Sequence, residues 1–211
     1  MRETARAAVG AGVAIGAHPG YADPQGFGRR ELGLAAPAIG TLVQAQCATL
    51  ADAVAPIGAS LQHVKLHGAL YHRASTDTEV AAAVASAVSG VDPALIVVGL
   101  PGSALERACR DRGLSYAREA FADRGYARDG HLLPRQAPGG LVTGAAIAER
   151  AVRMAVRDEV LLMDGTALPL AFETLCLHGD TPDAASSAAG VRRGLEAAGV
   201  TVAAMSRVIR R

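Results

Sequence analysis

Residues 63–68 read His-Val-Lys-Leu-His-Gly, and this stretch decides the fold. Polar and apolar side chains alternate along it, which predicts a short strand that ends at His67 and turns at Gly68. Two further stretches end in the same way: residues 14–20 read Ala-Ile-Gly-Ala-His-Pro-Gly, and residues 175–179 read Leu-Cys-Leu-His-Gly. We therefore expect three strands that each end on a histidine.

Helical patterns separate these strands. The spacing of apolar residues predicts helices over 1–10, 37–58, 76–89, 102–112, 143–156 and 182–198, and strands over 13–17, 63–66, 94–100, 114–118, 174–177 and 200–203. Strands that alternate with helices of this length pair in parallel through right-handed crossovers. The sequence thus predicts an α/β fold, either a doubly wound sheet or a barrel. No linker divides the chain, so we expect one domain over residues 1–211.

Composition excludes several classes of function. Half of the 211 residues are hydrophobic, 19% are charged and the formal net charge is +1. This balance disfavours disorder and offers no electrostatic footprint for nucleic acid or a membrane surface. Cys47, Cys109 and Cys176 are widely spaced and form no Cys-x-x-Cys, so neither a disulfide framework nor a zinc knuckle is expected. With no secretory leader after Met1, we expect a soluble cytoplasmic protein.

The three strand-end histidines, His18, His67 and His178, are the first candidates for chemistry. Ligand sites of parallel α/β folds lie at the carboxyl ends of the strands, so these imidazoles are expected to converge there. They could serve as general acids or bases, or bind a metal ion. The alternative is that each one hydrogen-bonds a loop carbonyl. Lys65 is the single lysine beside 20 arginines, which favours an anion-binding role over a salt-bridged surface position.

Two charged loops supply further candidates. Glu119 stands at a predicted strand end, with Asp123 and Arg124 just beyond it and Arg135 later in the loop. A solvated charged loop would explain the same pattern. The loop after the first strand carries Arg29 and Arg30, and its Gly-Phe-Gly is a weak signal for backbone contact with a ligand. The chain has no P-loop motif.

Five motifs, in order along the chain, resemble one known family. They are Gly-Ala-His-Pro-Gly (16–20) with Gln-Gly-Phe-Gly-Arg-Arg (25–30), Val-Lys-Leu-His-Gly-Ala-Leu-Tyr (64–71), Arg-Glu-Ala-Phe-Ala-Asp-Arg-Gly-Tyr (118–126), Leu-Pro-Arg (133–135) and Cys-Leu-His-Gly-Asp (176–180). The chain resembles the LamB/YcsF family of lactam-utilisation proteins, described as the A component of the prokaryotic 5-oxoprolinase. One departure is Leu66, where the family usually has proline.

This resemblance implies an irregular β/α barrel like that of polysaccharide deacetylases. It implies a hydrolase role in the ATP-dependent opening of 5-oxo-L-proline to L-glutamate, together with the B and C components of the enzyme, and with Mg²⁺ accompanying ATP. The candidates for acid/base catalysis or metal binding are His18, His67, His178, Glu119, Asp123 and Asp180. The candidates for binding anions are Lys65, Arg29, Arg30, Arg124 and Arg135.

Two other functions stay open at this point. One is a metal-dependent deacetylase or amidohydrolase that acts alone, with His18, His67 and His178 as metal ligands. The other is a non-catalytic component that binds the lactam. A requirement for ATP would distinguish a 5-oxoprolinase from the hydrolase that acts alone. Retention of lactam binding after His67→Ala would distinguish the non-catalytic component.

The family usually begins with two further βα units, which carry Asn-x-Asp-x-Gly-Glu and Cys-Gly-x-His-x-Gly-Asp motifs. Neither motif occurs in these 211 residues, and residues 1–9 resemble the helix that follows the second unit. We therefore expect a barrel that is incomplete at its N-terminus, inactive by itself and inclined to self-association.

Overall fold

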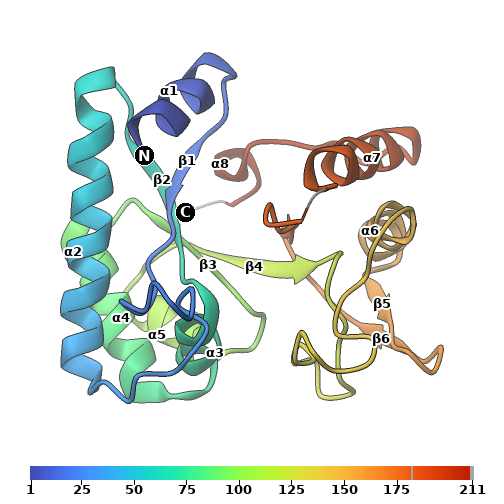
Figure 1. The fold of residues 1–211 in the computed structure, drawn as a ribbon, viewed down its shortest axis with the longest axis horizontal. Helices are drawn as coiled ribbons and strands as arrows, with labels where there is room; N and C mark the ends of the chain where they lie inside the picture. The colour runs from blue at the N-terminus through green and yellow to red at the C-terminus, as the bar shows by residue number, and fades with distance from the viewer. Residues whose placement is uncertain (182, 210–211) are drawn as a thin grey trace. The chain divides into compact units, whose positions relative to one another are not determined.

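Four parallel strands organise the first part of the chain. A computed structural model describes residues 1–181 and 183–209, which form two compact units: residues 1–118 with Ile209, and residues 119–208 (Figure 1). In the first unit β2 (Leu61–Lys65) lies between β1 (Ile15–Ala17) and β3 (Ile96–Gly99), and β3 pairs with the start of β4 (Tyr116–Phe121). All pairs are parallel, which confirms the α/β prediction.

Helices follow the strands of this unit as the sequence pattern requires. They are α1 (Arg2–Gly10), α2 (Ala36–Val54) with the short 3-10 helix η1 (Ala55–Ile57), α3 (Gly68–Thr76), α4 (Thr78–Val91) and α5 (Ala104–Asp111). Local caps define two starts: the Asp77 side chain accepts two backbone N–H groups at the start of α4, and Ser103 accepts one at the start of α5. Helix and strand side chains form the core, with Ile39, Val43, Val64, Val80, Val84 and Val97 almost fully buried.

The second unit begins where β4 continues past Arg118. Residues 119–121 of β4 pair in parallel with β7 (Thr174–Cys176). Helices α6 (Ala146–Arg157) and α7 (Ala184–Ala197) enclose a separate core of Ala122, Ile147, Ala151, Val191 and Leu195. Strands β5 (Glu159–Leu161) and β6 (Ala167–Pro169) form an antiparallel hairpin, and α8 (Met205–Val208) is the last element.

Most predicted elements are confirmed within one to four residues at their ends, but three differences have clear causes. The prediction of a strand over 200–203 is wrong, because Val200 instead packs against the core of the second unit. The sequence pattern does not predict helix α3, because this helix begins directly at the strand-end motif and contains several weak helix formers. The pattern also misses the β5–β6 hairpin, although Asp164-Gly165 is a typical hairpin turn. Residue 182, where the pattern begins its last helix, lies outside the described residues.

Among the residues that the structure describes, no helix is long and apolar enough to cross a membrane.

Candidate functional site

A cavity of about 400 Å³ lies in the first unit, at the carboxyl ends of β1 and β2. The loop after β1 forms most of its wall, and His18, Gln46 and His67 complete it. This position agrees with the rule that parallel α/β folds bind ligands where their strands end.

His18 and His67 are joined in a chain of hydrogen bonds beside this cavity. Nδ1 of His18 lies 2.6 Å from the carbonyl oxygen of Lys65, and Nε2 of His18 lies 3.0 Å from Nδ1 of His67. Nε2 of His67 lies 2.7 Å from the carbonyl oxygen of Phe27. The structure therefore brings together two of the three predicted histidines. Each of the two rings also lies within hydrogen-bonding distance of a backbone carbonyl oxygen.

The loop of residues 19–31 is held in shape by its own side chains. Asp23 accepts the N–H of Gly26 at 3.0 Å and binds the Arg30 guanidinium, with Nε at 2.9 Å. The Arg30 guanidinium, by its hydrogen bond, holds the pKa of the Asp23 carboxyl below its ordinary value. Arg30, a predicted anion ligand, thus binds a carboxylate of its own loop.

Phe27 has a strained backbone at the edge of the cavity. Its φ is +52°, an uncommon value for a residue with a side chain, and the residue is 60% exposed. The ring meets His67 edge-on with centroids 5.1 Å apart, and the Arg29 guanidinium lies 5.1 Å from the Phe27 ring centre. Strain of this kind persists only where the surroundings enforce it, and it clusters at functional sites.

Two residues that fasten this loop are not identified by the sequence pattern. Gln46 of α2 accepts the N–H of Gly20 at 3.1 Å and donates to the Gly20 carbonyl at 2.7 Å. Gln46 occupies an ordinary helical position, so nothing in the pattern distinguishes it.

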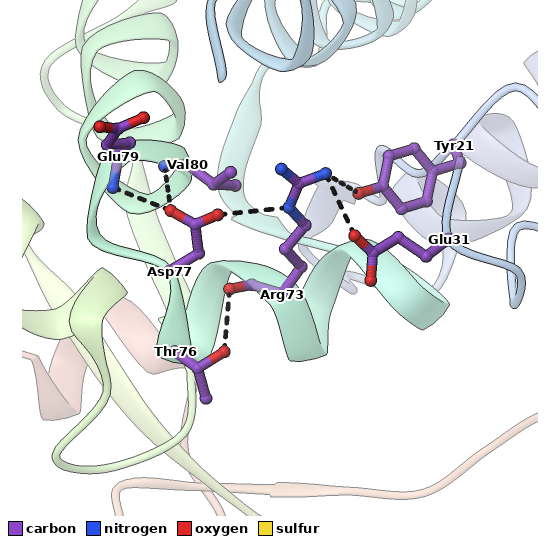
Figure 2. Close-up of polar contacts among 7 residues, drawn as sticks. All are labelled: Tyr21, Glu31, Arg73, Thr76, Asp77, Glu79 and Val80. Carbon is purple, nitrogen blue, oxygen red and sulfur yellow. Dashed lines mark hydrogen bonds and ion pairs between the residues drawn. The ribbon is translucent and has the colours of Figure 1, made fainter. Parts of the chain in front are cut away.

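Arg73 of α3 is the second fastening residue (Figure 2). Its Nη1 lies 3.4 Å from the Tyr21 hydroxyl and 3.3 Å from the Glu31 carboxylate, while its Nε lies 3.4 Å from Asp77. One guanidinium thus contacts both ends of the loop and the start of α4.

Lys65 and His63 point to the same side of β2, since they are two residues apart. Burial, and then the charge of Lys65, lower the pKa of His63. His63 packs against Gly16 of β1 so closely that a Cβ at Gly16 would lie 2.1 Å from its Nε2. His63 is therefore a half-buried histidine whose pKa lies below its ordinary value, and Lys65 lies on the same side of the strand.

In the second unit His178 is paired with Asp123. The ring Nδ1 and the backbone N–H of His178 each lie 2.8 Å from Oδ2 of Asp123, and the Phe121 ring stacks on the imidazole at 5.9 Å. Burial raises the pKa of Asp123, but the two hydrogen bonds from His178 outweigh it and leave that pKa below its ordinary value. An ionised Asp123 fixes the proton on Nδ1, which leaves Nε2 of His178 able to accept a proton.

The other predicted residues of this unit have different surroundings. Arg124 is buried and donates to the carbonyl groups of Gly140 at 3.1 Å and Leu133 at 2.6 Å, so it holds the long loop together. Arg135 lies 3.7 Å from the Asp180 carboxylate. Glu119 is a carboxylate that is only 3% exposed.

The predicted site residues are thus divided between the two units. His18, Lys65, His67, Arg29 and Arg30 belong to the first, and Glu119, Asp123, Arg124, Arg135, His178 and Asp180 belong to the second. Within residues 1–181 and 183–209, no three histidine, cysteine or acidic side chains are grouped so that they could hold a metal ion.

Comparison with known proteins decides the family. The LamB/YcsF family model matches residues 1–210. The chain belongs to this family. Its relatives include the A subunit of the 5-oxoprolinase of Methylococcus capsulatus, 49% identical over 97% of this chain and 79% of the relative. The corresponding 5-oxoprolinase protein of Chloroflexus aggregans is 48% identical over 96% of this chain and 81% of the relative.

A crystal structure supports the same assignment. The lactam utilization protein from Thermus thermophilus superimposes with a TM-score of 0.88 at 43% identity, covering 95% of this chain and 81% of that one. The arrangement of parallel strands is therefore that of a solved lactam utilization protein. The expectation about upstream βα units stays a prediction.

Proposed function

We propose that this chain is the A component of a 5-oxoprolinase, which opens 5-oxo-L-proline to L-glutamate at the expense of ATP. The observation that carries the proposal is the identity of 49% over nearly the whole chain with a relative of that name. The five motifs of the sequence analysis lie within this matched region.

The chemistry explains why ATP and several polar groups are needed. A five-membered lactam is an unstrained amide that resists attack by water, and phosphorylation of its amide oxygen makes the carbon reactive. Ring opening then needs a base for the water, a proton for the leaving nitrogen and cations for the anionic groups. His67 with His18 supplies an acid–base group in the first unit, and His178 with Asp123 supplies one in the second.

The roles of the single residues are part of the proposal. Lys65, Arg29 and Arg135 are assigned to anions of the substrate, while Arg30 and Arg124 act mainly through the loops that they hold. Glu119 and Asp180 remain candidates for proton transfer. We also propose an irregular β/α barrel formed as one domain, Mg²⁺ bound with ATP, cooperation with the B and C components, and a cytoplasmic location.

The test is a release assay for glutamate and phosphate, run on this chain with and without the B and C components. We expect both products only with all three components, lactam and ATP. Lys65→Ala and His67→Ala should each reduce lactam-dependent ATP hydrolysis to background at an unchanged melting temperature, while His131→Ala, at an exposed histidine, should have no effect. Product release by this chain alone without ATP would overturn the proposal in favour of an independent hydrolase.

A further inference from the structure

The wall of the cavity is a loop whose shape depends on the groups that fasten it. Residues 18–35 run irregularly from β1 to α2, and residues 20–28 supply most of the cavity lining. Ordered loops longer than about 12–15 residues are uncommon and usually functional. The cavity volume of about 400 Å³ is within the range of small-molecule sites. The contacts that hold this loop therefore decide what the cavity can bind.

Arg73 of α3 fastens the loop near both of its ends. Nη1 of Arg73 lies 3.4 Å from the Tyr21 hydroxyl and 3.3 Å from the Glu31 carboxylate (Figure 2). Nε of the same guanidinium lies 3.4 Å from Asp77, the residue that caps α4. A planar guanidinium donates in several fixed directions, whereas the point charge of a lysine does not keep this geometry. One side chain thus ties the loop to two helices.

Tyr21 carries this contact to the cavity. The residue is 5% exposed and lines the cavity, while its hydroxyl is the group that Arg73 contacts. The Arg73 side chain is 19% exposed, so water weakens this contact less than it weakens a contact at the surface. The Glu31 carboxylate is 56% exposed, and its pair with Arg73 contributes less. The position of a cavity-lining ring is therefore set by a side chain of α3.

Helix α3 also holds the loop through two backbone hydrogen bonds at its start. The N–H of His67 donates to the Pro19 carbonyl at 2.8 Å, and the N–H of Ala69 donates to the Gly28 carbonyl at 3.0 Å. Neither bond involves the Arg73 side chain, so the middle of the loop stays in place when that side chain is removed. Only the two ends that Arg73 contacts are released.

We infer that Arg73 is a positioning residue for the ligand of this cavity, because it keeps the Tyr21 ring and the Glu31 end of the loop in the shape that binds. The inference rests on the proposed function and places the lactam, 5-oxo-L-proline, in this cavity. A wall that is in its binding shape for only a fraction of the time weakens apparent affinity by that fraction. Once the ligand is bound, the wall is in place and the reacting groups are unchanged. Loss of Arg73 therefore raises KM and leaves kcat nearly constant.

Hydrogen exchange of the whole chain, measured by mass spectrometry, tests the fastening without substrate or partner proteins. In Arg73→Ala we expect exchange over residues 19–31 to become about 10-fold faster, while α2 and α5 keep their rates. Tyr21→Phe removes only the hydroxyl and should reproduce much of this effect. The matched control is Arg110→Ala, since Arg110 of α5 forms an ion pair of the same i,i+4 spacing as Arg73. This control should leave the exchange of the loop unchanged.

Kinetics of the complete enzyme test the role in binding. Arg73→Ala should raise KM for 5-oxo-L-proline about 10-fold and change kcat by less than about 2-fold, whereas a merely structural loss would lower kcat through the amount of folded enzyme. Arg73→Lys should restore only part of the affinity. The double variant Arg73→Ala/Tyr21→Phe should be no worse than Arg73→Ala, because both changes remove one contact. Arg110→Ala should keep the wild-type KM.

Unchanged exchange of the loop in Arg73→Ala, or faster exchange with an unchanged KM, would overturn the inference. A fall in kcat at constant KM would also overturn it, because Arg73 would then act on folding or on the chemical steps. If Arg73→Ala does not fold, Tyr21→Phe decides both measurements. If exchange responds as expected while the wild-type complex releases no glutamate, the proposed function fails and the fastening of the cavity wall by Arg73 stands.

Discussion

Replacement of Gly68 by alanine tests how the loop of residues 19–31 is held against α3. Gly68 is the first residue of α3 and has φ = +57°, and a Cβ there would lie 2.4 Å from the Gly28 carbonyl oxygen. Ordinary contact begins at 3.4 Å, so this oxygen would have to move by about 1 Å (3.4 − 2.4). Backbone cannot rotate away as a flexible side chain can, and the loop must therefore shift as a whole.

The magnitude has two parts. A left-handed backbone costs an alanine about 1–2 kcal/mol wherever it occurs. The overlap adds about 1–3 kcal/mol, and the Ala69 N–H bond to the Gly28 carbonyl, at 3.0 Å, adds about 1 kcal/mol if it breaks. The matched control is Gly58→Ala, because Gly58 has φ = +71° and open space around its Cβ position. The difference between the two variants isolates the contact with Gly28.

The assay is urea unfolding of both variants beside the wild type, together with melting temperatures. We expect Gly68→Ala to cost about 1–4 kcal/mol more than Gly58→Ala, with about 2–4 °C of melting temperature for each kcal/mol. Gly68→Ala should also lower 5-oxoprolinase activity, since Gly28 follows the residue whose carbonyl accepts from His67. Equal costs within about 0.5 kcal/mol would refute the reasoning, because overpacking alone should exceed that margin.

Three further predictions concern the cap of α4, the pH dependence of Asp123 and the reactivity of two buried cysteines. Asp77→Ala should cost about 0.5–2 kcal/mol of unfolding free energy by removing the cap of α4, and Asp77→Asn should restore most of it; equal losses would exclude the cap as the cause. The hydrogen bonds from His178 outweigh burial and lower the pKa of Asp123 in the folded chain, so this carboxylate stabilises the fold above its ordinary pKa of 3.8. That stabilisation is lost as the pH falls from 3.8 through the lowered pKa. In urea titrations at acid pH, the difference in unfolding free energy between wild type and Asp123→Asn should therefore shrink. Burial raises the pKa of Cys47 to about 11 and of Cys109 to about 12, so both should resist a thiol reagent until urea unfolds the chain, and fast labelling of either in the native state would contradict this.

Much of the first unit follows from local pattern alone. The alternation in residues 63–68 places His63 and Lys65 on one side of β2, because a strand repeats every two residues, and His67 follows the end of this strand. The glycine after each strand-end histidine marks where the chain leaves the sheet. These features are local, so they can be identified before any long-range contact is known.

The assignment of charged residues cannot be completed in this way. The resemblance to the family implies four arginines as ligands of substrate anions. In the structure Arg30 binds Asp23, and Arg124 binds the carbonyls of Gly140 and Leu133. Conversely, the sequence pattern does not identify Arg73, although this side chain joins α3 to both ends of the loop of residues 19–31. Whether an arginine binds a ligand or a group of the protein depends on which acceptors lie within its reach. For Arg30 and Arg124 these acceptors lie 7 to 16 residues away in the sequence, in loops whose course the local pattern does not predict.

The hydrogen-bond partners of His18 and His67 are the strongest case of information that residue types do not contain. His18 and His67 can be selected as acid–base candidates from their strand-end positions, but the groups that their rings contact include the carbonyl oxygens of Lys65 and Phe27. Every residue has such an oxygen, so the identities of Lys65 and Phe27 say nothing about it. What matters is that β2 aims one carbonyl at His18 and that a loop strained at Phe27 aims another at His67. The contacts of these two rings are therefore a property of backbone geometry, and substitutions that move the loop, such as Gly68→Ala, should change them without altering any ionisable group.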